Sequence, residues 1–200
     1  YENTLVNALI HKYKNGLSAV MLTTGCGSTN SITGLLDAWQ DNTPIIFISG
    51  QIKKKETSRN AETSLRQFGV QEADIVTIVD SLTKYAVMIN EPKDILYHLE
   101  KAVYLALNGR QGPVWIDIPL DVQGAFVDEG DLKRFTPEHP SKVKNIKNIE
   151  NFINIYKNAK RPIILAGNGV RLSGSIDKLK NFSSKNNIPC VVSYLAADYF

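Results

Sequence analysis

The alternation of apolar and polar segments along the chain predicts strands and helices in turn. Short apolar runs at residues 19–22, 45–48 and 114–118 are typical of buried strands. Between them, apolar residues recur every three or four positions over 32–39 and 96–106, which indicates helices with one apolar face. Strands that alternate with helices form parallel βαβ units, so we expect an α/β fold.

This pattern is interrupted once and then restarts. Residues 1–123 are expected to form a first domain, and residues 124–147, with their prolines and charged runs, an interdomain linker. The α/β pattern resumes over residues 148–200, which we expect to begin a second domain. The chain opens within a helical stripe from Val6 to Tyr13 and stops in mid-pattern. We therefore expect a first domain truncated at its start and an incomplete second domain.

A glycine-rich stretch follows the first predicted strand and precedes the first predicted helix. Gly25 and Gly27 remove side chains where another group comes close, and Ser28 or Thr29 is placed to cap the helix. A strand, a glycine turn and a helix present main-chain N–H groups to a ligand at the carboxyl end of the strand. A tight turn without any ligand is the alternative interpretation.

Composition and charge narrow the classes of partner. The chain has 200 residues and a net charge of +3 with both signs interspersed, which argues against a nucleic-acid surface. No apolar run is long enough to cross a bilayer, and no signal-peptide pattern is present, so we expect no membrane association. Cys26 and Cys190 lie far apart in predicted core segments, so we expect no disulfide and a reducing, cytoplasmic setting. His11, His98 and His139 lack partners at ligand spacing, so no metal site is expected.

Six short motifs occur along the chain in a fixed order. They are Gly25-Cys26-Gly27-Ser28-Thr29-Asn30, Ser49-Gly50-Gln51, Gln71-Glu72-Ala73-Asp74, Gly109-Arg110-Gln111-Gly112-Pro113-Val114, Asp117-Ile118-Pro119, and Arg161-Pro162 with Gly167-Asn168-Gly169. Together they resemble the thiamine-diphosphate-dependent enzymes of the acetolactate synthase type, over nearly the whole chain. The resemblance implies a parallel-sheet pyrimidine-binding domain at 1–123 and part of a Rossmann-like central domain at 148–200.

The same resemblance implies an activity, cofactors and partners. In this family thiamine diphosphate supports lyase or transferase chemistry, in which an acyl-anion equivalent from a 2-oxo acid adds to a carbonyl acceptor. A C-terminal domain holds the diphosphate and Mg²⁺, and nothing in this sequence matches its motif. FAD is a further cofactor in some members. The cofactor lies between subunits, which implies a homodimer or homotetramer.

Site residues follow from the resemblance, position by position. Tyr1-Glu2-Asn3 resembles the motif that carries the catalytic glutamate, so Glu2 is the candidate, although it lies closer to the glycine turn than the family spacing implies. A glutamate further upstream or an ordinary first-turn glutamate are the alternatives. Gln71 matches a glutamine directed toward the substrate, with a helix-capping glutamine as the alternative. The expected cofactor-binding residues are Thr24, Gly25, Cys26, Gly27, Asn30 (or a cap), and Gly167 and Gly169 (for FAD, or a plain strand-to-helix turn).

One departure from the family pattern bears on function. Acetolactate synthases commonly have lysine after Asp-Ile-Pro, whereas this chain has Leu120. The missing cation favours a relative that acts on another 2-oxo acid or an aldehyde acceptor. It also keeps open a second class of function, a non-catalytic scaffold or regulatory module that retains the fold.

Overall fold

Four parallel strands form the sheet of the first of two compact units, which meet in sequence at residues 138 and 139. The computed structural model describes residues 16–137 and 146–200. Strand order is β1-β2-β4-β3, with every neighbouring pair parallel. The predicted helix from Val6 to Tyr13 and the candidate Glu2 lie outside the described residues. The expected α/β fold with a parallel sheet is confirmed.

The elements of the first unit follow one another in βα order. Its strands are β1 (Ser18–Leu22), β2 (Ile45–Gln51), β3 (Ala86–Met88) and β4 (Val114–Pro119). Its helices are α2 (Cys26–Thr29), α3 (Ile32–Asp41), α4 (Ile75–Val79), α5 (Ile95–Leu107) and α6 (Leu120–Gln123). Short 3₁₀ turns are η1 (Lys54–Glu56), η2 (Ser58–Asn60), η3 (Asp80–Leu82), η4 (Pro92–Asp94) and η5 (Glu129–Asp131).

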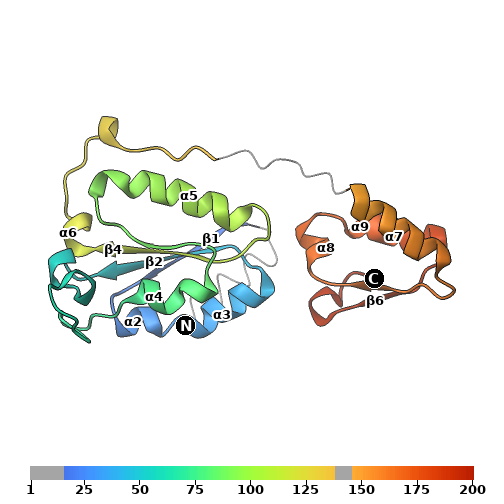
Figure 1. The fold of residues 1–200 in the computed structure, drawn as a ribbon, viewed down its shortest axis with the longest axis horizontal. Helices are drawn as coiled ribbons and strands as arrows, with labels where there is room; N and C mark the ends of the chain where they lie inside the picture. The colour runs from blue at the N-terminus through green and yellow to red at the C-terminus, as the bar shows by residue number, and fades with distance from the viewer. Residues whose placement is uncertain (1–15, 138–145) are drawn as a thin grey trace. The chain divides into compact units, whose positions relative to one another are not determined.

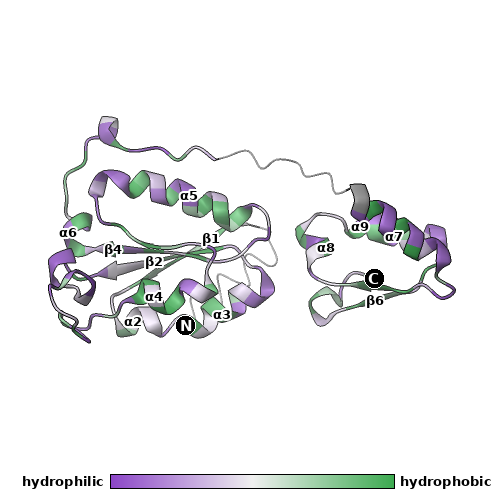
Figure 2. Ribbon diagram, viewed as in Figure 1, coloured by the Kyte–Doolittle hydropathy of each residue, from purple (hydrophilic) through white to green (hydrophobic). Residues whose placement is uncertain are grey.

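Helices cover both faces of this sheet, as a parallel sheet requires. Helix α5 lies on one face and α2, α3 and α4 lie on the other (Figure 1). On the α3 face, Phe47 and Trp115 stack with ring centroids 4.9 Å apart inside the core. On the α5 face, Ile116 packs with Ala102 of the helix. Helix α5 shows green hydrophobic and purple hydrophilic residues in Figure 2, as expected for an amphipathic helix.

The second unit is smaller and is described by itself. It contains α7 (Ile146–Asn158), β5 (Ile164–Ala166), α8 (Gly169–Leu172), α9 (Ile176–Asn186), β6 (Cys190–Val192) and η6 (Tyr194–Ala196). Strands β5 and β6 pair in parallel. Its core contains Ala166, Ala196 and Tyr199.

Residues 124–137, predicted to begin the linker, run along α5. Phe135 packs edge-on against Tyr97 at a centroid distance of 5.6 Å, and its main-chain N–H donates to Glu100 at 2.8 Å. Lys133 pairs with Asp94 at 2.7 Å. This part of the segment therefore packs on the first unit.

Several local expectations are wrong. Ser28 and Thr29 do not cap α3: their hydroxyls donate backwards to the carbonyls of Thr23 and Cys26, because residues 26–29 form their own helical turn. Cys26 is exposed and therefore is not a core residue, whereas Cys190 is half-buried in β6 and packs against the core of the second unit. The exposure of Cys26 follows from this local helical turn, which apolar periodicity does not encode.

His98 has a partner that sequence spacing did not indicate. Its Nδ1 lies 2.6 Å from the Tyr85 hydroxyl, on the side of α5 that faces β3. Burial lowers the pKa of His98, although Asp94 acts in the opposite direction. Burial also raises the pKa of Tyr85 to about 12. The pair joins the helix to the strand within the half-buried margin of the core.

Candidate cofactor-binding site

A buried carboxylate stands at the carboxyl end of the sheet. Register places Ser49 of β2 opposite Asp117 of β4, and the Ser49 hydroxyl donates to Asp117 Oδ1 at 2.5 Å. The indole Nε1 of Trp115 donates to the same hydroxyl at 2.8 Å. Asp117 is 1% exposed. A carboxylate so deeply buried needs such donors, because an unpartnered charge in the core is strongly unfavourable.

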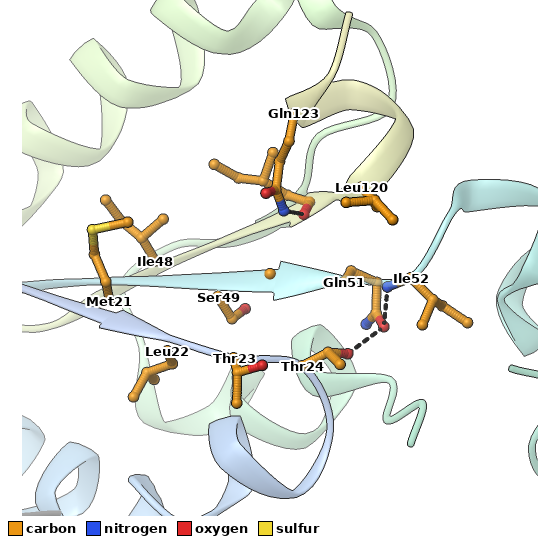
Figure 3. Close-up of a pocket in the computed structure, with 12 residues that line it drawn as sticks. Met21, Leu22, Thr23, Thr24, Ile48, Ser49, Gln51, Ile52, Leu120 and Gln123 are labelled. Atoms are coloured by element: carbon orange, nitrogen blue, oxygen red, sulfur yellow. Dashed lines mark hydrogen bonds between the residues drawn. The ribbon is translucent and has the colours of Figure 1, made fainter. Parts of the chain in front are cut away.

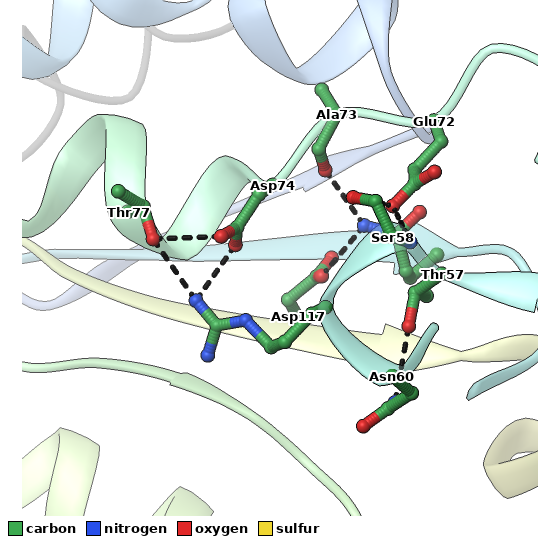
Figure 4. Close-up of polar contacts among 10 residues, drawn as sticks. Thr57, Ser58, Asn60, Glu72, Ala73, Asp74, Thr77 and Asp117 are labelled. Atoms are coloured by element: carbon green, nitrogen blue, oxygen red, sulfur yellow. Dashed lines mark hydrogen bonds and ion pairs between the residues drawn. The ribbon is translucent and has the colours of Figure 1, made fainter. Parts of the chain in front are cut away.

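Gln51, the last residue of β2, extends the chain of contacts. Its Nε2 donates to Asp117 Oδ2 at 3.0 Å and to the carbonyl of Ala73 at 2.9 Å. Its Oε1 accepts from the Thr24 hydroxyl at 2.9 Å and from the main-chain N–H of Ile52 at 3.0 Å. Figure 3 shows the last two contacts, and Figure 4 labels Ala73 and Asp117, which accept the first two. One side chain therefore joins the ends of β1, β2 and β4 to the segment before α4.

The environment of Asp117 shifts its titration. Burial raises its pKa from 3.8 to about 6, and the hydrogen bonds from Ser49 and Gln51 only partly offset that effect. Asp74 also raises the pKa and Arg59 lowers it. Arg59 itself pairs with Asp74 at 2.7 Å and donates to Thr77 (Figure 4).

The glycine turn lies next to this network and carries an intrachain contact. Gly25 has φ +58°, and a Cβ added there would stand 1.6 Å from the main-chain carbonyl oxygen of Gln71. Gln71 also has a positive φ, 58°. Gly25 therefore lets the main chain of residue 71 pack directly on the turn. The sequence predicted that another group comes close to this glycine, and in the structure that group is the main chain of Gln71.

Glu72 holds the loop that leads to Gln71. It accepts from the Ser58 hydroxyl at 2.6 Å and from the main-chain N–H groups of Phe68 and Gly69 at 2.8 and 3.2 Å. Burial alone would raise its pKa, but the hydrogen bonds from Ser58, Phe68 and Gly69 outweigh it and lower the pKa. The long polar segment after β2 is thus anchored by one ionised carboxylate.

A cavity of about 680 Å³ opens at the carboxyl ends of β1, β2 and β4. Its lining is mostly apolar and includes Met21, Ile48 and Leu120 (Figure 3). Thr24 and Gln51 supply polar groups on one side. Leu120 is 55% exposed, so it presents an apolar surface where the family pattern has a cation. A site of this kind suits a small, partly apolar molecule.

The structure brings most of the predicted site residues together. Thr24, Gly25, Cys26, Gly27 and Asn30 all belong to the turn after β1, and Gln71 contacts that turn through its main chain. The side chains of Cys26, Asn30 and Gln71 are exposed, while Gly25 is buried.

Gly167 and Gly169 belong to the second unit, after β5. The hydroxyl of Tyr199 donates to the carbonyl of Gly167 at 3.0 Å and accepts from the main-chain N–H of Arg171 at 2.9 Å. Arg171 also forms an ion pair with Asp198. The buried side chain of Tyr199 therefore stabilises this turn through two hydrogen bonds to its main chain.

Sequence reasoning missed the roles of Ser49, Gln51 and Asp117. The available signal was a polar residue inside each of two apolar strands, at Ser49 in β2 and Asp117 in β4. Among the described residues, no cluster of three or more His, Cys, Asp or Glu side chains is arranged to hold a metal ion. No helix in the described part of the chain is long and apolar enough to span a membrane.

Comparison with known proteins assigns the class. Residues 8–78 match the family described as thiamine pyrophosphate enzyme, N-terminal TPP binding domain, and residues 149–200 match the thiamine pyrophosphate enzyme central domain. The parallel sheet with a glycine turn at its carboxyl edge is the fold expected of the first domain. The chain belongs to the thiamine pyrophosphate enzyme family.

Within that class, similar curated proteins include acetolactate synthases. The chain is 35% identical to the large subunit from Lactococcus lactis, over 92% of this chain and 31% of that protein. It is 33% identical to the large subunit from Corynebacterium glutamicum, over 89% of this chain and 28% of that protein. It is 33% identical to the mitochondrial acetolactate synthase of Schizosaccharomyces pombe, over 88% of this chain and 27% of that protein. The chain spans between about a quarter and a third of the length of these relatives.

Proposed function

We propose that this chain is the N-terminal and central portion of a thiamine-diphosphate-dependent lyase or transferase similar to acetolactate synthase. The observation that carries the proposal is the joining of two family motifs, the glycine turn and Gln71, into one body at the carboxyl edge of the sheet. Thiamine diphosphate, when bound, would supply the electron sink that lets a 2-oxo acid lose CO2 and its acyl carbon add to a carbonyl acceptor.

The surface at the glycine turn fits a flat ring of the cofactor. Cys26, Asn30 and Gln71 are exposed there, so no side chain of the described residues covers them completely. We assign Thr24, Gly25, Cys26, Gly27 and Asn30 to the pyrimidine face. Gly25 has an indirect role in this proposal, because its missing side chain admits the main chain of Gln71.

Two residues are assigned to proton handling and substrate positioning. Glu2 is the candidate that exchanges a proton with the pyrimidine ring, in line with the known use of a carboxylate as general acid or base. Gln71 is the candidate that orients the substrate through its exposed amide. Both assignments rest on the family motifs.

Leu120 bears on the substrate. Leu120 lines the cavity with an apolar side chain, which gives no electrostatic attraction to the carboxylate of an acceptor substrate. We therefore propose an acceptor that is an aldehyde or a 2-oxo acid other than that of acetolactate synthase. Leu120→Lys is expected to raise KM for aldehyde acceptors and lower it for 2-oxo acid acceptors.

The remaining partners follow from the family. We propose that the complete protein is a homodimer or homotetramer, in which a further domain holds the diphosphate and Mg²⁺. FAD at Gly167 and Gly169 is the alternative to a plain strand-to-helix turn.

Cofactor analysis of the complete protein tests this function. Mass and ultraviolet–visible analysis of the purified protein is expected to find thiamine diphosphate near one per chain, and flavin only if the second turn binds it. The 200-residue chain alone is expected to bind thiamine diphosphate more weakly than micromolar; tight binding by calorimetry would refute the need for another domain.

A catalytic variant tests the role of Glu2. Glu2→Gln is expected to slow 2-oxo acid consumption by about 100-fold or more, the usual contribution of a general acid or base. Glu62→Gln, in the exposed loop after η2, is the matched control and is expected to leave the rate unchanged. Equal rates in both variants would contradict the assignment.

A non-catalytic scaffold is the second candidate function. It is favoured by the Gly25–Gln71 contact, which accounts for the conformation of Gly25 without any ligand. Purified complete protein without thiamine diphosphate, and without affinity for it in the presence of Mg²⁺, would support the scaffold over the enzyme.

A further inference from the structure

The amide of Gln51 contacts the ends of β1, β2 and β4 together with the segment before α4. The two segments that carry the proposed cofactor face, the glycine turn and residues 71–74, each contact it. Thr24 is adjacent to Gly25, and Ala73 is two residues from Gln71. The position of one segment relative to the other therefore depends on how this amide is oriented.

Main-chain groups identify which end of the Gln51 amide is the oxygen and which is the nitrogen. The N–H of Ile52 can only donate, so it requires the oxygen of the Gln51 amide. The carbonyl of Ala73 can only accept, so it requires the nitrogen. If the amide were rotated by half a turn, its NH₂ group would face the N–H of Ile52 and its oxygen would face the carbonyl of Ala73. The remaining N–H is thereby directed at Asp117 Oδ2.

We propose that Asp117 is a positioning residue, whose ionised carboxylate holds the Gln51 amide and through it aligns the glycine turn with the segment that carries Gln71. The role requires a carboxylate because two donors converge on it. Ser49 Oγ donates to Oδ1 and Gln51 Nε2 donates to Oδ2. An aspartic acid or an asparagine has only one oxygen free to accept in this plane, so one donor loses its partner.

Protonation of Asp117 therefore changes the alignment. The charged groups that act on it from the neighbouring elements are Asp74 at the start of α4 and Arg59 of η2; Ser49 and Gln51 are its neutral partners from β2. Burial brings the pKa of Asp117 to about 6, so the carboxylate is mostly ionised at neutral pH and mostly protonated at about pH 5. The alignment of the two segments is thus sensitive to mild acid.

This inference rests on the proposed function for its significance, but its geometry is testable in the 200-residue chain without any cofactor. ¹H–¹⁵N spectra between about pH 5 and 7.5 follow the indole N–H of Trp115, the Gln51 side-chain amide and the main-chain N–H groups of Ile52 and Gly25. The expected result is a joint shift of all four signals with a midpoint at about 6. The chain has two tryptophans, so a Trp39→Phe variant assigns the indole signals.

Substitution separates Asp117 from other groups. Asp117→Asn is expected to abolish the shared transition and to leave the signals of Gln51, Ile52 and Gly25 displaced at all pH values. Asp121→Asn, at an exposed carboxylate in α6, is the matched control and is expected to keep the transition. If Asp117→Asn does not fold, the titration of the unmodified chain still tests whether the four signals shift together. Signals of Ile52 and Gly25 that do not move with that of Trp115 would overturn the proposal.

A second arm distinguishes this proposal from the proposed function. In the complete protein, Asp117→Asn is expected to weaken thiamine diphosphate binding by about tenfold, equivalent to the loss of one hydrogen bond. A coupled titration in a protein that does not bind the cofactor would leave the positioning role standing and reject the enzyme. Normal cofactor binding without a coupled titration would support the enzyme and reject the positioning role of Asp117.

Discussion

The two units each place glycines in the turn that follows a strand, yet the glycines of the two turns differ in what they contact. In the first unit Gly25 has a positive φ and stands against the main chain of Gln71. In the second unit a Cβ added at Gly169 would meet nothing within 4 Å, and one added at Gly167 would meet only Ser193 Oγ at 3.6 Å. The first turn is therefore filled by the chain itself, and the second leaves open space beside its glycines.

The supports of the two turns differ as well. The first turn is held by an amide that contacts a buried carboxylate, and the second by the hydroxyl of Tyr199. Carboxylates change charge near neutral pH when they are buried, so only the first support is expected to respond to mild acid. The comparison shows that similar glycine motifs can have unlike physical origins within one chain.

Gly25→Ala is expected to have the largest effect. The new methyl group would overlap a main-chain carbonyl, and the residue would also be forced into a left-handed conformation. We expect a loss of about 4 kcal/mol in the free energy of unfolding of the first unit, measured by urea denaturation with tryptophan fluorescence. Both tryptophans lie in that unit. A loss of less than about 1 kcal/mol would mean that the Gln71 contact is not maintained in solution.

The second-largest expected effect is the pH dependence of stability that Asp117 causes. Because the folded pKa of Asp117 is raised to about 6 from 3.8, the folded chain binds a proton that the unfolded chain does not bind between these values. This contribution to stability is present below about pH 4 and is lost as the pH rises through about 6.

The difference in free energy of unfolding between the unmodified chain and Asp117→Asn isolates that contribution. It is expected to grow by about 2 kcal/mol in favour of the unmodified chain from about pH 7.5 to 4.5. Groups such as His98 and Glu72 are common to both proteins and cancel. A difference that is constant with pH would show that Asp117 titrates normally.

How far sequence could predict this molecule differs between fold and site. The strands β1, β2 and β4 were predictable because a buried parallel strand is a short apolar run, and α3 and α5 because apolar residues recur at helical spacing. The separate helical turns at residues 26–29 and 92–94 were not predictable, since their hydrogen bonds are local.

The site was predictable as a list of residues but not as a network. Motif resemblance located Gln71 as a site residue and the segments that contain Gln51 and Asp117, but not their roles. The contact between Ser49 and Asp117 joins residues 68 positions apart through the register of β2 and β4. Register depends on the packing of the whole sheet, which no single motif contains. The glycine turn was interpreted as open to a ligand, and the intrachain contact with Gln71 appears only when α4 and its preceding segment are in place.

Tyr199→Phe is expected to have a smaller effect, confined to the second turn. Tyr199 is 1% exposed, and removal of its hydroxyl leaves the carbonyl of Gly167 and the N–H of Arg171 without this partner. We expect a loss of about 1.5 kcal/mol in the second unit, seen as faster hydrogen exchange at the Arg171 amide. Tyr194→Phe, at a residue 92% exposed, is the control. Tryptophan fluorescence should be unchanged in both, and equal exchange in the two variants would contradict the support assigned to Tyr199.

Gly169→Ala is expected to have the smallest effect and gives the sharpest test of the comparison. Gly169 begins helix α8, its φ is not positive, and the added methyl group meets no atom within 4 Å. Alanine is the better helix former, so the free energy of unfolding should change by no more than about 0.5 kcal/mol, in either direction. If the substitution instead destabilises the second unit by more than about 1 kcal/mol, its glycine serves an intrachain contact as Gly25 does, and the contrast between the two turns fails. If stability is unchanged while flavin binding by the complete protein is lost, the open space beside this glycine is where a ligand approaches the main chain.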